Sequence, residues 1–200
     1  ALFVLGGSKP EDNLMLAETK SNKVLASGLF GPFCLMSKGI NLGKQNKIMS
    51  RQLKTLGKRT KKTLHKTIVP IDLAIEKNKK RQDILIKDFP QNSEILDLGR
   101  LTIKLYEKEI RRAPAILFKG LAGLCNNKNF SLATEKLLKA TASSKGFTVI
   151  SGGHTLTMIE KLKIPKSKFD YVSLSGGALI DYLAKGTLPG IKAININPKN

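Results

Sequence analysis

Short apolar runs alternate with longer amphipathic stretches along the chain, and residues 147–163, FTVISGGHTLTMIEKLK, are the clearest example. Residues 147–150 are aromatic and β-branched, as is typical of a buried strand. Residues 151–153 interrupt this run, and Thr155 is positioned to cap a helix with an inward face of Met158, Ile159 and Leu162. A strand, a glycine turn and a helix N-terminus together can bind an anion. The same residues also suit a tight packing corner, so this unit alone leaves both interpretations open.

The same alternation continues through the rest of the chain. It predicts strands at residues 1–5, 23–26, 67–75, 95–98, 115–118 and 171–173, and helices at 14–20, 29–37, 101–111, 130–144 and 179–183. Pro70 predicts an irregular or edge strand at 67–75. Alternating strands and helices predict a parallel sheet with right-handed crossovers. Glycines follow most of these strands, where open α/β sheets place their ligand crevice.

Length and composition narrow the class of protein. The 200 residues suit one large domain or two small ones. There is no run of eighteen apolar residues and no signal-peptide pattern, so we expect a cytoplasmic protein without a membrane span. Cys34 and Cys125 lie far apart and match no metal-binding spacing, which predicts free thiols and no metal site. The chain begins with Ala1 in a strand, and the sequence leaves open whether it was trimmed from a longer protein.

The charge is the unusual feature of the composition. The chain has 35 Lys and Arg against 15 Asp and Glu, a formal net charge of +20. Such an excess costs stability through self-repulsion. It predicts a polyanionic partner, with nucleic acid as the first expectation and an anionic membrane surface as the second.

Residues 44–66 concentrate this charge, with nine Lys or Arg and no acid. One stripe is expected in helical register, with Met49, Leu53 and Leu56 on the opposite side. Its members are Lys44, Lys47, Arg51, Lys54, Lys58, Lys61 and His65. A solvated helix face is the alternative, but the absence of acidic partners in the segment favours a binding surface. A hairpin is expected near Lys77–Arg81 and extends this surface. The expected RNA contacts are Lys44, Lys47, Arg51, Lys54, Lys58, Arg59, Lys61, Lys62, Lys66, Lys79, Lys80 and Arg81.

Several loops resemble motifs of one enzyme family. Residues 5–9, LGGSK, are similar to its LGGAK loop, and 38–44, KGINLGK, to an archaeal KGxDLGK segment. Residues 118–126 correspond to its ANGPAGVFE loop. Residues 151–154 are similar to an archaeal GGGH motif, and residues 173–178 to its SSGGGA motif. In this order the motifs resemble the C-terminal, nucleotide-binding half of phosphoglycerate kinase, most closely the archaeal branch. The resemblance implies a single Rossmann-like α/β domain over residues 1–200, three layers with a mostly parallel sheet, carrying a basic helical insertion at about 44–66.

The resemblance also implies a nucleotide site, with departures from the family pattern. The positions that match are Gly6, Gly7, Lys9, Gly28, Gly120, Gly152, Gly153, His154, Gly176 and Gly177. Asn126 replaces the acid that would accept the ribose hydroxyls, and Lys119 replaces an asparagine near the phosphates. Leu174 and Ser175 replace Ser/Thr and Gly in the last loop. These departures predict a degenerate site, without catalytic residues and without a bound cofactor.

Two functions of different class remain. The first, which the charge and the loop departures favour, is a catalytically inactive, phosphoglycerate-kinase-like pseudoenzyme that binds RNA as part of the archaeal ribosome or a factor bound to it. Its partners would be ribosomal RNA and neighbouring ribosomal proteins. The second is the ATP-binding half of a phosphoglycerate kinase, which transfers a phosphoryl group between ADP/ATP and 3-phosphoglycerate. ATP or ADP with Mg²⁺ binds only under this second hypothesis.

Overall fold

A six-stranded parallel sheet forms the centre of the computed structural model, which describes residues 1–19, 23–174 and 176–195. The strand order is β3-β2-β1-β7-β8-β9, and every neighbouring pair is parallel. The central strands are short runs of buried apolar side chains because helices cover both faces. The strands are β1 (Leu2–Leu5), β2 (Lys23–Ala26), β3 (Thr67–Ile68), β7 (Ala115–Lys119), β8 (Phe147–Ser151) and β9 (Tyr171–Ser173).

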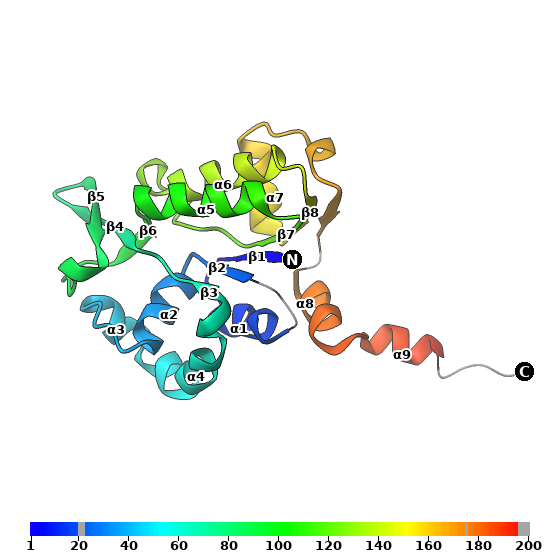
Figure 1. The fold of residues 1–200 in the computed structure, drawn as a ribbon, viewed down its shortest axis with the longest axis horizontal. Coiled ribbons are helices and arrows are strands. Elements are labelled where there is room, and N and C mark those ends of the chain that lie inside the picture. Colours follow the sequence, from blue (N-terminus) through cyan, green and yellow to red (C-terminus); the bar gives the residue numbers. More distant parts are fainter. Residues whose placement is uncertain (20–22, 175, 196–200) are drawn as a thin grey trace, which may run out of the picture.

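A smaller antiparallel sheet of order β5-β4-β6 lies beside it (Figure 1). Its strands are β4 (Asp72–Lys77), β5 (Lys80–Leu85) and β6 (Ile95–Leu98). The expected hairpin is confirmed: Asn78 and Lys79 join β4 to β5 with φ of 52° and 59°, as a two-residue hairpin turn requires. The single strand predicted at residues 67–75 is wrong. The segment containing Pro70 separates β3 from β4, which belong to different sheets.

The helices form two layers, one on each side of the parallel sheet (Figure 1). One layer contains α1 (Pro10–Glu18), α2 (Phe30–Ser37), α3 (Lys44–Ile48), α4 (Ser50–Thr63) and α8 (Gly176–Lys185). The other contains α5 (Arg100–Arg112), α6 (Leu132–Ala142) and α7 (Gly153–Lys161). The expected three-layer α/β fold with a mostly parallel sheet is confirmed. α9 (Pro189–Asn195) extends away from both layers.

Helix α5 illustrates how the sequence pattern builds these layers. Its buried residues Thr102, Ile103, Tyr106 and Ile110 recur at helical spacing. The hydroxyl of Tyr106 lies within 2.8 Å of the carbonyl oxygens of Ala26 and Ile68, so the helix is fixed to the ends of β2 and β3.

Short 3₁₀ helices complete the fold: η1 (Leu64–Lys66), η2 (Ile86–Asp88), η3 (Lys128–Phe130) and η4 (Lys166–Lys168). Among the helices of the described residues, none has the length and apolar character needed to cross a membrane.

Candidate functional site

The carboxyl ends of β2, β1, β7 and β8 lie side by side at one edge of the parallel sheet. A glycine with positive φ follows each of them: Gly28 (52°), Gly7 (86°), Gly120 (81°) and Gly152 (101°). The sheet also changes winding direction at this edge, between β1 and β7, which is where open α/β folds bind ligands. The structure therefore brings together four glycine loops that are far apart in the sequence.

Three of these loops interlock through their backbones. The Leu29 N–H donates to the Gly7 carbonyl at 3.0 Å, and the Gly28 N–H donates to the Ala122 carbonyl at 3.0 Å. A Cβ at Gly28 would run into the backbone of Gly7, and one at Gly120 into that of Gly6. The glycines are therefore needed for the loops to approach one another, and they fix the floor of the site.

A cavity of about 440 Å³ opens beside these loops. Its size lies within the range of small-molecule pockets. Its wall is apolar where Leu29, Ile95, Leu121 and Leu124 line it, and its polar groups include the side chains of Glu94, Asn126 and His154. An apolar slot with a few polar groups suits a flat heterocycle that carries a polar substituent.

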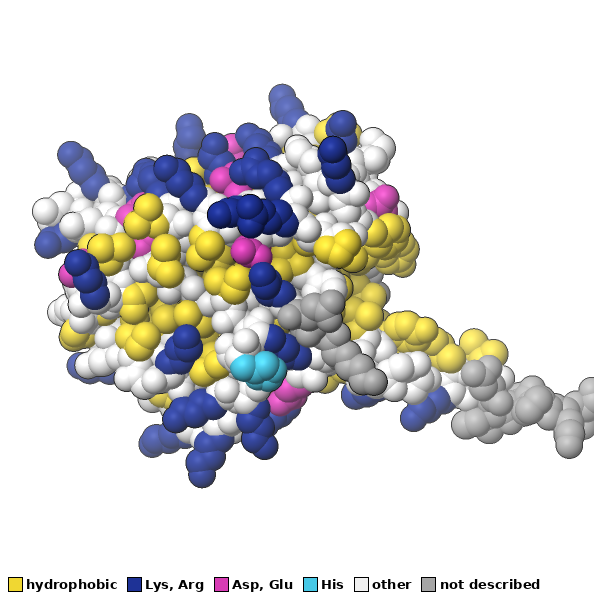
Figure 2. Space-filling model, viewed as in Figure 1, with side chains coloured by type: hydrophobic (Ala, Val, Ile, Leu, Met, Phe, Trp, Pro, Cys, Tyr) yellow, Lys and Arg dark blue, Asp and Glu magenta, His cyan; other side chains and the backbone are white. Residues whose placement is uncertain are grey.

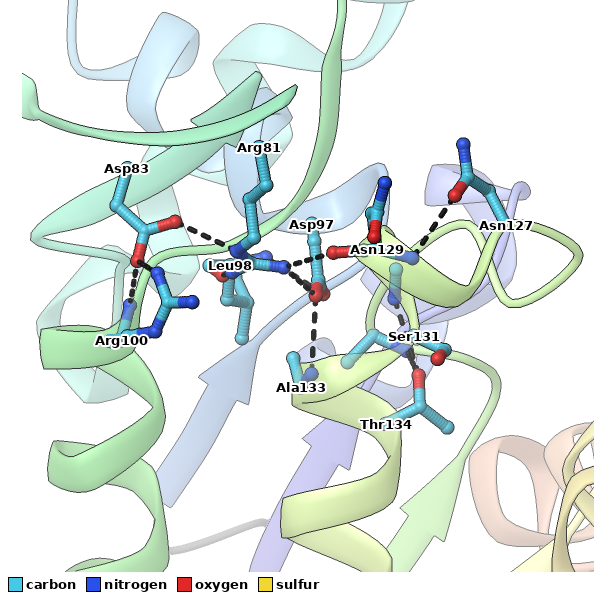
Figure 3. A network of polar contacts seen from close by, with 12 residues as sticks. Arg81, Asp83, Asp97, Leu98, Arg100, Asn127, Asn129, Ser131, Ala133 and Thr134 are labelled. Atoms are coloured by element: carbon cyan, nitrogen blue, oxygen red, sulfur yellow. Dashed lines mark hydrogen bonds and ion pairs between the residues drawn. The ribbon is translucent and has the colours of Figure 1, made fainter. Parts of the chain in front are cut away.

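A buried ion pair holds one wall of this cavity in place (Figure 3). Arg81 of β5 donates to the Asp97 carboxylate of β6 at 2.7 Å and to the Asn129 carbonyl at 3.0 Å. The Ala133 N–H of α6 also donates to this carboxylate at 3.2 Å. Burial raises the pKa of Asp97 to about 6, although Arg81 and the backbone donors act in the opposite direction. Arg81 thus joins the hairpin, the end of β6 and the loop before α6.

Lys119 ends β7 beneath the glycine loops, and its side chain is 11% exposed. Its Nζ donates to Asn13 Oδ1 at 2.8 Å and lies 3.7 Å from the Asp12 carboxylate, both on the first turns of α1. Burial lowers the pKa of Lys119, and Asp12 counteracts this in part. Lys9, just before α1, is exposed at the same edge.

The corner between β8 and α7 differs from the sequence expectation. Gly152 caps α7, whereas Thr155 is buried inside the helix and accepts a hydrogen bond from the Gly120 N–H at 3.1 Å. The predicted cap at Thr155 is therefore wrong. Gly153 has no positive φ, and a Cβ built on it meets nothing within 4 Å. Gly153 is open to a ligand, so the packing-corner interpretation does not hold at this residue.

The last glycine loop contributes to the same edge. A Cβ on Gly176 would contact Gly152, while Gly177 faces open space. Both begin α8, and Leu174 just before it is 81% exposed. Ser175 lies outside the described residues.

The basic side chains are distributed differently from the predicted stripe. The helix breaks at Met49 into α3 and α4, and Gly57 is buried inside α4 without ending it. Figure 2 shows Lys and Arg side chains along opposite borders of the visible face, separated by a hydrophobic band. Exposed basic residues of the expected set include Lys44, Lys47, Arg51, Lys54, Lys58, Arg59, Lys61, Lys62, Lys79 and Lys80.

Several of the expected RNA contacts have partners within the fold. Arg59 pairs with Glu18 of α1 through hydrogen bonds of 3.0 and 2.6 Å, and Lys44 lies 3.0 Å from Glu94. Lys66 donates to the Thr19 carbonyl at 2.6 Å. The side chain of Arg81 is only 8% exposed, so it does not belong to a basic surface. Glu18 and Glu94, which lie outside residues 44–66, therefore pair with two basic residues of that segment.

Comparison with known proteins decides the family. The phosphoglycerate kinase family model matches residues 1–186. The chain belongs to the phosphoglycerate kinase family. It is 38% identical to the phosphoglycerate kinase of Methanothermus fervidus over 204 residues, which are 96% of this chain and 49% of that enzyme. It is 35% identical to the Methanococcus maripaludis enzyme, with 97% and 49% covered.

Solved structures agree with this assignment. The crystal structure of phosphoglycerate kinase from Pyrococcus horikoshii superimposes with a TM-score of 0.86 at 28% identity, over 98% of this chain and 51% of that one. The Coxiella burnetii enzyme gives a TM-score of 0.83 at 27% identity, over 99% and 53%. The chain therefore spans about half the length of the phosphoglycerate kinases it matches.

These comparisons correct the preferred function of the sequence analysis. The matches are to phosphoglycerate kinases, and none of these findings indicates RNA binding or association with a ribosome. The interpretation as an RNA-binding pseudoenzyme is therefore wrong. It relied on net charge, but partners in other elements engage part of that charge.

Sequence reasoning missed two polar residues near this site and gave a third the wrong role. Asn13 holds Lys119, Glu94 lines the cavity, and Arg81 was assigned to the surface. The positions of Asn13 and Glu94 depend on contacts between distant elements. Arg81 carried a usable signal, because alternation along β5 places Arg81 and Asp83 on one face.

Proposed function

We propose that this chain is the nucleotide-binding half of a phosphoglycerate kinase and that ADP and ATP bind along the carboxyl edge of its parallel sheet. The proposal rests on two observations together: the family match over residues 1–186, and the positive-φ glycines Gly7, Gly28 and Gly120, which line one cavity at the sheet edge. Open α/β folds bind ligands at this edge of the sheet, and the helix N-termini that follow glycine turns favour phosphate groups.

The apolar part of the cavity receives the purine. Leu29, Ile95, Leu121 and Leu124 form walls that can stack against a flat ring. The loop that carries Leu121 and Leu124 is held in place, because the Leu124 N–H donates to the Leu96 carbonyl at 2.8 Å and the Ala122 N–H to Thr134 Oγ1 at 2.9 Å. The slot is therefore formed before the nucleotide arrives, which lowers the entropy cost of binding.

The ribose lies towards the polar side chains of the cavity. Asn126 has a carbonyl oxygen that accepts a hydroxyl hydrogen bond and an amide that donates one. It therefore keeps part of the hydrogen bonding of the acid expected from the family motif. The replacement at Asn126 changes ribose affinity without removing the site.

The phosphates extend from the cavity towards Gly153 and Gly177. Both glycines leave open space where a side chain would stand, and each lies at the N-terminus of a helix of nine or more residues. The free N–H groups and the helix dipoles there favour an anion. Lys9 supplies an exposed positive charge at the same edge.

Phosphoryl transfer needs positioning and charge neutralisation more than covalent chemistry by the protein. This chain would hold the nucleotide and present its terminal phosphate at the sheet edge. The phosphoglycerate would be held by the other half of the enzyme, because this chain spans about half the length of its relatives.

Titration calorimetry with MgADP tests the proposal. We expect saturable binding at one site, with Gly153→Ala weakening it about tenfold, which is the loss of roughly one charge-assisted hydrogen bond. Gly190→Ala is the matched control, because Gly190 also has open space around it but lies in α9, away from the cavity. No measurable heat of MgADP binding by the unaltered chain would reject the proposed function.

A further inference from the structure

Lys119 and Ser151 are neighbours at the ends of β7 and β8, where the register pairs them directly. Paired residues of parallel strands point to the same face of a sheet. Lys119 points to the face covered by α1, because its Nζ contacts Asn13. The Ser151 hydroxyl therefore lies on that same face, and the two polar groups form one buried row.

Lys119 has donor capacity that the described residues do not use. An ammonium has three N–H donors. Lys119 makes one hydrogen bond, to Asn13, and the Asp12 oxygen at 3.7 Å is too far for a second. The lowered pKa of Lys119 has the same cause, because burial removes water that the neighbouring side chains only partly replace.

Ser151 is an exception among the described residues, because its Oγ is buried and has no hydrogen-bond partner. The residue is only 1% exposed. A buried hydroxyl without a partner is costly, so this position favours a group that enters from outside the chain and hydrogen-bonds to it.

Both residues depart from the motifs that this chain resembles. Lys119 stands where the family loop has asparagine, and Ser151 stands where the archaeal GGGH motif begins with glycine. The two departures add a cation and a hydroxyl at adjacent positions. Together they add two hydrogen-bond donors, one of them charged, at the carboxyl ends of β7 and β8.

Lys119 and Ser151 lie close in sequence to residues that line the proposed nucleotide cavity. Gly120, which follows Lys119, lines that cavity, and His154 lines it three residues after Ser151. The adjacent Gly152 and Gly153 place no side chain in between. The lysine stem is flexible, so Nζ can move from Asn13 towards a group that enters at Gly153.

We propose that Lys119 Nζ and Ser151 Oγ together bind a phosphoryl oxygen of the nucleotide. This subsite rests on the proposed function, since it uses the same cavity, but it assigns the contact to two residues that the family motif does not supply. A compact ammonium and a hydroxyl donor are complementary to an anionic phosphoryl oxygen, while Asn13 and Asp12 hold the lysine until the nucleotide binds.

Ser151→Ala and Lys119→Asn test the subsite by titration calorimetry with adenosine, AMP and ADP. Ser151→Ala should leave the stability of the free chain unchanged or higher, because it removes an unpaired buried hydroxyl. It should weaken ADP about threefold to tenfold, and Lys119→Asn should weaken ADP about tenfold or more, the loss of one hydrogen bond to a charged group. Adenosine affinity should stay the same in both variants. AMP reports whether the contact is to the first phosphate or to a later one.

The controls are Ser143→Ala and Lys145→Asn, exposed residues near the opposite edge of the sheet, which should bind all three ligands normally. If Ser151→Ala lowers stability and leaves ADP affinity unchanged, the hydroxyl has an internal role and the inference is overturned. That measurement decides the matter even if Lys119→Asn fails to fold. If both variants fold and each binds ADP as tightly as the unaltered chain does, the inference is overturned while the proposed function stands. Absence of ADP binding by the unaltered chain overturns the proposed function and this inference with it.

Discussion

Two adjacent glycines at the start of α7 have different physical roles. Gly152 has a φ of 101°, a backbone conformation that side-chain-bearing residues rarely adopt. Gly153 has no such constraint, and nothing lies near the place of its Cβ. Gly152 is thus needed for the backbone conformation of the turn, whereas Gly153 leaves space for a ligand at the candidate site.

Alanine substitutions should separate these roles. Gly152→Ala should lower the free energy of unfolding by about 1 kcal/mol or more, because alanine is strained at positive φ. Gly153→Ala should change it by less than about 0.5 kcal/mol. Urea denaturation of both variants provides the measurement. Equal losses of stability would show that both glycines serve packing.

Arg81 should be the most sensitive residue of the cavity wall. Removing one partner of a buried ion pair costs about 3–5 kcal/mol, so Arg81→Met should destabilise the chain strongly at pH 7. Without Arg81, burial raises the pKa of Asp97 further above its value in an unfolded chain. The folded variant then binds a proton more readily than the unfolded chain, and its stability recovers as the pH falls through that raised pKa.

The difference in unfolding free energy between Arg81→Met and the unaltered chain should therefore be smaller at pH 5 than at pH 7. Arg100→Met is the control, since Arg100 pairs with Asp83 at an exposed position and should cost less than about 1 kcal/mol at both pH values. A loss that is the same at pH 5 and pH 7 would mean that Asp97 does not titrate in this range.

At the scale of elements, the basic helix α4 shows how neighbours change the meaning of a charge run. Lys54, Lys58 and Lys62 are spaced four residues apart, and all three are exposed. Arg59 is also exposed but forms a two-point contact with Glu18 of α1. The sequence shows the excess of lysine, and only the fold brings Glu18 to it.

Substitution of two adjacent residues in α4 should therefore have opposite effects. Lys58→Gln removes repulsion from lysines on both sides and should stabilise the chain by about 0.4–1 kcal/mol at low salt. Arg59→Gln breaks the pair with Glu18 and should cost up to about 1 kcal/mol. Both differences in stability should be smaller in about 0.5 M salt, because salt at this concentration screens exposed charges over a few ångströms. Effects of equal sign would show that net charge alone governs the stability of this helix.

Most elements of the fold could be predicted from the sequence, because the period of the apolar residues is a local signal. The strands at 23–26 and 95–98 and helix α5 follow it closely. The sheet of the strand at 95–98 could not be predicted: this strand, β6, pairs with β4 in the antiparallel sheet rather than with a parallel neighbour. Sheet assignment depends on long-range contacts, which periodicity does not encode.

The site was predicted in part, for a similar reason. The glycines at positions 7, 28, 120 and 152 mark turns after strands, which are visible in the sequence, and the structure gives each a positive φ. The partners of Lys119 and Asp97 come from residues distant in the sequence. Net charge gave the wrong function because it describes the composition of the surface and says nothing of the cavity.

At the scale of the whole molecule, hydrophobic side chains lie along one side of α8 and α9, where Tyr182, Leu183 and Ile191 are exposed (Figure 2).

The carboxyl edge of the sheet carries the candidate site. The chain spans about half the length of its relatives, and the expectation that residues 1–200 form a single domain stays a prediction.

A crystal structure of the chain grown with MgADP tests the central claim most directly. We expect the purine in the cavity between β6 and residues 120–126, with the phosphates at Gly153 and within reach of Lys119. A nucleotide bound anywhere else on the chain, or an empty cavity at a saturating concentration of MgADP, would contradict it.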